Sequence, residues 1–254
     1  MRGKICHLLY ETSLQIKVRG WDLMLKMFFA TLCITTILLG STISAQAADT
    51  ETVQPSQKEI EKMLDDAKKE TEFAKKNWNK IAKEKIEEGK KEGNRKKSDS
   101  TLSTMATGTA NFTTGDLLVT MDSTYGSAGF RYGHAAIVYT SNEYTIESYD
   151  TTGVKKFAMT KWKPGGKIDT MIALWVKGAT STDYGQAKSY SGSQIGDPYN
   201  YSFWDSDRSD KFYCSQLLWK AWKYAGFNVN GGWDTLISPY DIVQDSDTTG
   251  YYTR

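Results

Sequence analysis

The stretch RYGHAAIVYTSNEYTIESY, residues 131–149, contains two short apolar runs separated by a polar turn. Their β-branched and aromatic residues predict two strands, over residues 135–139 and 144–149, joined as an antiparallel hairpin. His134 stands at the head of the first strand, directly after Gly133. A glycine at that position indicates a bend or a close approach of the backbone.

The length of the turn decides which residues share a face of this hairpin. A loop of two or four residues pairs Val138 with Thr145, which places His134 and Glu147 on one face as diagonal neighbours about 7 to 8 Å apart. A loop of three or five residues turns Glu147 to the other face. The alternative for Glu147 is a solvent-facing position on an edge strand.

A second run, KFYCSQLLWKAWKYAGF at residues 211–227, has apolar residues at helical spacing and stops at Gly226. Cys214 falls in the first turn of this predicted helix, where unpaired backbone N–H groups favour a thiolate. The alternative is a buried cysteine that acts as a small hydrophobic residue. A nucleophilic cysteine also needs a nearby base, and His134 is a candidate.

Further strands are predicted at residues 116–121 and 170–176, and a helix at residues 181–191. With the hairpin and the cysteine helix, these elements make a small antiparallel sheet packed against helices. The predicted fold class is therefore α+β.

The N-terminal residues 1–47 have the pattern of a cleavable signal peptide, with an apolar segment at 28–39 and a small-x-small motif that ends at Ala47. Translation from Met24 or Met27 would give a leader of more ordinary length. An uncleaved anchor is the alternative, but the apolar run is short for the ~20 residues of a membrane span. The expected location is secreted or associated with the cell envelope.

Removal of this leader leaves Cys214 and His134 as the only cysteine and histidine. An internal disulfide is then impossible, and a closed zinc site lacks its four ligands. No metal or cofactor is expected. The balance of 32 Lys and Arg against 30 Asp and Glu gives no sign of a nucleic-acid partner.

The charged segment 48–98 predicts a helix with a capping box at Ser56 and Glu59, acting as a spacer or a propeptide. Its apolar stripe is thin, which favours a solvated helix over a coiled coil, and its basic residues suggest association with a cell wall or membrane surface. A linker at 99–110 and one domain at 111–254 follow. The stripe consists of Ile60, Leu64, Ala67, Ala74, Trp78 and Ile81.

Six motifs in order, GDLLVT, YGHAAIVY, IES, IGDPYNYSF, FYCSQLLWKAW and SPYDIVQDS, resemble the permuted papain-fold amidases of the YaeF/YiiX-like group, relatives of the NlpC-type hydrolases. The resemblance covers most of residues 112–247. In this family the histidine strand precedes the nucleophile helix, as His134 precedes Cys214 here. The resemblance implies that Cys214 is the nucleophile, His134 the base and then acid, and Glu147 the group that orients the imidazole.

The predicted function is therefore hydrolysis of an amide, with bacterial peptidoglycan peptide as the expected substrate. Tyr199, Tyr201 and Trp204 are candidates to line the cleft, although aromatics in such a run also occur in cores. Two alternatives remain: a lipid acyltransferase or thioesterase of the same fold, and a non-catalytic wall-binding module.

Overall fold

The computed structural model describes residues 54–92, 110–122, 132–232 and 235–254. The predicted leader and translation start, and nearly all of the predicted linker, lie outside these residues. Among the described residues, no helix is long and apolar enough to cross a membrane.

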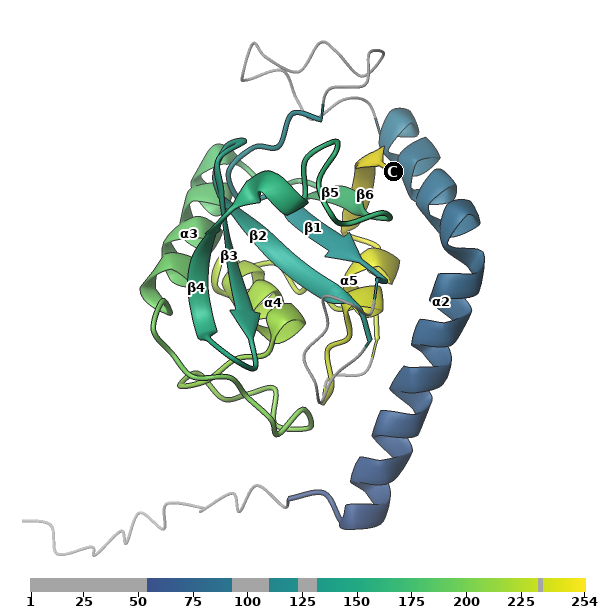
Figure 1. The fold of residues 1–254 in the computed structure, drawn as a ribbon, viewed down its shortest axis with the longest axis vertical. Helices are drawn as coiled ribbons and strands as arrows, with labels where there is room; N and C mark the ends of the chain where they lie inside the picture. Colours follow the sequence, from purple (N-terminus) through teal and green to yellow (C-terminus); the bar gives the residue numbers. More distant parts are fainter. Residues whose placement is uncertain (1–53, 93–109, 123–131, 233–234) are drawn as a thin grey trace, which may run out of the picture. The chain divides into compact units, whose positions relative to one another are not determined.

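Six antiparallel strands form one sheet in the order β4-β3-β2-β1-β5-β6 (Figure 1). This sheet and its helices confirm the predicted α+β class. The strands are β1 Leu117–Thr120, β2 His134–Thr140, β3 Tyr144–Tyr149, β4 Gly153–Ala158, β5 Ile172–Val176 and β6 Thr248–Thr253. The helices are α2 Gln57–Lys91, α3 Ser181–Ser193, α4 Cys214–Tyr224 and α5 Pro239–Gln244, with a short 3-10 helix, η2, at Met159–Lys161.

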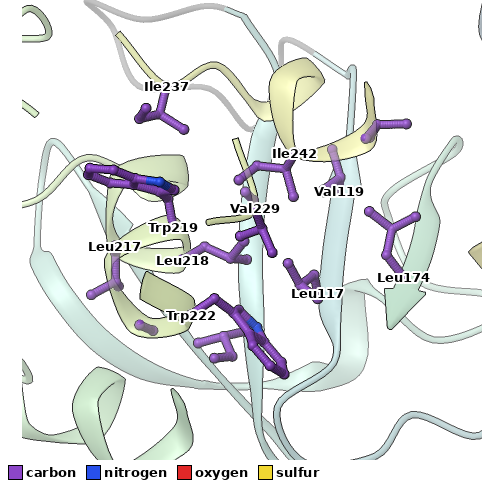
Figure 2. Packing of buried hydrophobic residues seen from close by; sticks show 14 of the residues in the cluster. Leu117, Val119, Leu174, Leu217, Leu218, Trp219, Trp222, Val229, Ile237 and Ile242 are labelled. Carbon is purple, nitrogen blue, oxygen red and sulfur yellow. The ribbon is translucent and has the colours of Figure 1, made fainter. Parts of the chain in front are cut away.

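Each face of the sheet has its own hydrophobic cluster. On one face, α3 and α4 pack against β2, and α5 packs against β1. Figure 2 shows Leu218 and Trp222 of α4 directed into the cluster that also holds Leu117 of β1. On the other face, the segment that contains η2 covers a smaller cluster that includes the buried Trp162.

The sequence patterns missed β4 and β6, which are the two edge strands of the sheet. Lys155 and Lys156 interrupt β4, and β6 reads TTGYYT without an aliphatic residue. Edge strands face solvent on one side and carry polar residues, so their hydrophobic alternation is weak.

One face of α2 is buried, where the sequence favoured a solvated helix. Small side chains on this face allow close packing against β6 and α5. Lys85 is 7% exposed and donates hydrogen bonds to the carbonyls of Asp245, at 2.8 Å, and Thr248, at 3.0 Å. The capping box at Ser56 is confirmed. The buried positions are Ala67, Thr71, Ala74, Trp78, Ala82, Lys85 and Gly89.

The contact between α2 and β6 can be tested at Gly89, where an added Cβ would lie 2.2 Å from the carbonyl oxygen of Gly250. We expect Gly89→Ala to lower the free energy of unfolding by about 1–3 kcal/mol, measured by chemical denaturation. Gly185→Ala on α3 is the control, because its Cβ would meet nothing within 4 Å. That variant should gain about 0.5–1 kcal/mol from helix propensity. Equal stabilisation of both variants would contradict the packing described.

Candidate active site

His134 is the first residue of β2, and its Nε2 atom lies 2.7 Å from Oε2 of Glu147 on β3. Their side chains are 1% and 0% exposed. Gly133 has φ 97°, and a Cβ there would lie 2.3 Å from the carbonyl oxygen of Thr120. The close backbone approach predicted at Gly133 is therefore confirmed, and it brings the chain into β2 with the imidazole over Glu147.

The strand register that places His134 and Glu147 on one face arises from two features, a three-residue loop and a register shift, whose effects cancel. Thr140 pairs with Tyr144, so the hairpin loop has three residues, the length predicted to turn Glu147 away. A register shift between Val138 and Thr140 then moves the pairing by one residue. Val138 consequently pairs with Thr145, as the sequence analysis expected for a loop of two or four residues. The pairing that places Glu147 on the face of His134 is confirmed, although it arises from a three-residue loop with a register shift and not from a loop of two or four residues.

Five donors surround the carboxylate of Glu147. Oε2 accepts from His134, from Lys161 Nζ at 2.5 Å and from the Tyr149 hydroxyl at 2.9 Å. Oε1 accepts from the Thr145 hydroxyl at 2.5 Å and from Trp162 Nε1 at 3.1 Å. A carboxylate that accepts this many hydrogen bonds is stabilised in its charged form.

Burial opposes the charge of Glu147, but the hydrogen bond and charge of His134 and the charge of Lys161 outweigh it. Together they hold the pKa of Glu147 far below its usual range. The His134 ring is also fixed from its faces, because Tyr149 stacks on it with ring centroids 4.4 Å apart. Trp162 lies nearly parallel to the same ring at 6.1 Å.

Cys214 is the first residue of α4, which confirms its predicted place in the first turn, and it is 4% exposed. The buried Gln216 side chain accepts from the backbone N–H of Tyr213 at 3.2 Å and donates to the carbonyl of Ser206 at 3.0 Å. Ser215 donates to the carbonyl of Ile237 at 2.7 Å. These bonds attach the start of α4 to the loops on both sides of it.

The thiol of Cys214 lies close enough to the side chain of His134 for each group to shift the pKa of the other. Because Glu147 occupies Nε2, the ring nitrogen left for the sulfur is Nδ1. Burial disfavours the charged form of each partner, but their contact outweighs it. The hydrogen bond and charge of His134 lower the pKa of the Cys214 thiol, and the contacts with Cys214 and Glu147 raise the pKa of His134. These shifts favour a thiolate–imidazolium pair.

The structure separates the three aromatic residues predicted to line a cleft. Tyr199 is 5% exposed and belongs to the hydrophobic core. Tyr201 is 58% exposed, and its hydroxyl donates to the carbonyl of Asp150 at 3.1 Å. Tyr201 therefore contacts the backbone of the residue that follows Tyr149. Trp204 is half-buried.

Sequence reasoning missed four of the five groups that hold Glu147. Thr145 and Tyr149 alternate with it along β3, so strand periodicity placed them on its face. Lys161 and Trp162 stand in a polar segment without periodicity, and no sequence signal indicated their role. Within the described part of the chain, no group of three His, Cys, Asp or Glu side chains is arranged to hold a metal.

The histidine strand precedes the cysteine helix in the chain, and both meet at one site. That order defines a permuted papain-like domain. The family model described as permuted papain-like amidase, YaeF/YiiX, C92 family, matches residues 114–237, which contain Cys214, His134 and Glu147. This match confirms the family resemblance that the sequence motifs predicted.

A solved structure similar to the chain is titled metalloprotein yiiX from Escherichia coli O157:H7. It is 19% identical, with a TM-score of 0.43, and the match covers 56% of this chain and 97% of that one. No curated protein matches the chain.

The contact between Cys214 and His134 predicts the pH dependence of thiol alkylation. Because the thiol pKa is lowered, alkylation by iodoacetamide should remain fast below the pKa of free cysteine, about 8.5. His134→Ala should move the apparent pKa upward by about one unit or more. Peptide mass analysis separates Cys214 from Cys6 and Cys33. An identical pH profile in both proteins would contradict the contact.

Proposed function

We propose that this protein is a cysteine amidase or peptidase that uses Cys214 as nucleophile, His134 as general acid and base, and Glu147 as the group that orients His134. The observation that supports this proposal is the connected set of contacts from thiol to imidazole to buried carboxylate. The match to the model of an amidase family points to the same bond type.

The reaction would proceed in two steps. The Cys214 thiolate attacks the amide carbonyl, and the C–N bond breaks as the His134 imidazolium gives its proton to the leaving amine. A water molecule then passes a proton to His134 and attacks the thioester carbonyl. The C–S bond breaks, which releases the carboxylic acid and restores the thiolate. The N–H of Cys214 has no partner within the helix at this position and is suited to hold the oxyanion.

Glu147 would act through His134 rather than on the substrate. The hydrogen bond between Glu147 and Nε2 of His134 fixes the rotation of the ring and leaves Nδ1 directed to the sulfur. Its negative charge stabilises the imidazolium that forms with the thiolate.

We propose cell-wall peptide as the substrate and an exported or envelope location. The export pattern of residues 1–47 and the many lysines of α2 support this assignment. Tyr201 and Trp204 are the proposed contacts for substrate, whereas the burial of Tyr199 favours a structural role.

The substrate assignment is tested by mass analysis of purified peptidoglycan fragments incubated with the full-length protein. We expect new free amine and carboxyl ends. In Cys214→Ala the rate at which they form should fall by at least about a thousandfold. Turnover of lipid acyl chains instead would support the acyltransferase alternative. Binding to purified wall without cleavage would support the wall-binding module. Fragments that stay unchanged across a broad screen of temperature and pH would contradict the proposed substrate.

The role of Tyr201 is tested by steady-state kinetics. Because its ring is exposed next to Asp150, Tyr201→Ala should raise KM several-fold and leave the melting temperature nearly unchanged. Tyr224→Ala is the matched control, since Tyr224 is 64% exposed at the opposite end of α4 from Cys214. Equal KM values in both variants would show that Tyr201 does not contact substrate.

A further inference from the structure

Lys161, the last residue of η2, places a second cation on the carboxylate that binds His134. Its Nζ atom lies 2.5 Å from Oε2 of Glu147, and His134 Nε2 lies 2.7 Å from the same oxygen. The two nitrogens are therefore no more than 5.2 Å apart, the sum of these two distances. The Lys161 side chain is 18% exposed, so solvent screens this pair only in part.

Aromatic side chains hold the Lys161 ammonium in this position. It hydrogen-bonds the hydroxyl of Tyr149, which in turn donates to Glu147. The ammonium also lies 4.6 Å from the centre of the Tyr149 ring and 5.9 Å from that of Trp162. Cation–π contacts of this kind favour a fixed cation. Lys161 is therefore held beside the same two rings that stack against His134.

The charged groups that face His134 come from three elements. Glu147 faces it from β3, Lys161 from η2 and Cys214 from α4. Lys155 on β4 is opposite Glu147 in the sheet register, but its side chain is exposed. With Cys214 and Glu147 negative and His134 and Lys161 positive, the site carries no net charge.

We propose that Lys161 is a positioning residue that shares the Glu147 carboxylate with His134 and so limits how tightly His134 holds its proton. This inference rests on the proposed function for its catalytic meaning, because His134 must give up its proton to the leaving amine. Without Lys161, Glu147 would stabilise the imidazolium of His134 more strongly. The Lys161 ammonium on the same oxygen reduces this stabilisation and also repels the imidazolium directly.

The proton affinity of His134 can be measured without any catalysis, by NMR titration of its imidazole in the full-length Cys214→Ala protein. That background removes the coupled thiol, so His134 titrates alone. Loss of the signal in His134→Ala distinguishes it from His7. Lys161→Met should raise the pKa of His134 by about one unit, and Glu147→Gln should lower it by a similar amount. Lys161→Arg, which keeps the charge, should restore a value near that of the background protein.

Lys155→Met is the matched control, because it removes a lysine opposite Glu147 that is exposed, and it should leave the titration unchanged. An unchanged or lower pKa in Lys161→Met would overturn the inference. Lys161→Gln provides a second neutral variant if the methionine protein does not fold, as judged by circular dichroism. The proposed amidase function is tested separately, in the fragment assay. A negative result there would leave the expected pKa shifts of His134 unaffected.

Discussion

The site depends on one buried charge, the carboxylate of Glu147. An isolated carboxylate with no exposed surface is unfavourable by several kcal/mol, so its environment must supply compensating partners. They come from β2, from β3 and from the segment at η2, which covers that face of the sheet. Satisfying this one group therefore fixes the hairpin register, the position of η2 and the orientation of the His134 ring.

The thiol of Cys214 is positioned by a different set of forces. Helix α4 is anchored by its apolar face, with Leu218 and Trp222 in the core (Figure 2). Its first turn is held by the hydrogen bonds of Gln216 and Ser215. Hydrophobic packing thus brings the start of α4 to the first residue of β2, and hydrogen bonds set its final orientation. The thiol reaches a histidine whose charge is determined on the other face of the sheet.

Sequence patterns were sufficient to place a residue where a single strand or helix periodicity determines its position. The alternation in residues 144–149 placed Glu147 on the face of His134 once Val138 pairs with Thr145, and the helical spacing after Cys214 placed the thiol in a first turn. They were insufficient where a contact joins distant segments without periodicity, as Lys161 and Trp162 do, or where an edge strand is polar. The hairpin has the pairing expected for a loop of two or four residues although its loop has three, because the register shift compensates for the difference.

The most direct test of this account is the protonation state of His134 in the intact protein at pH 7, measured by ¹⁵N NMR of histidine-labelled full-length chain. If Glu147 holds an imidazolium against a Cys214 thiolate, both ring nitrogens of His134 carry protons. A neutral ring with one bare nitrogen at that pH would contradict the charge-stabilised pair on which the proposed chemistry depends.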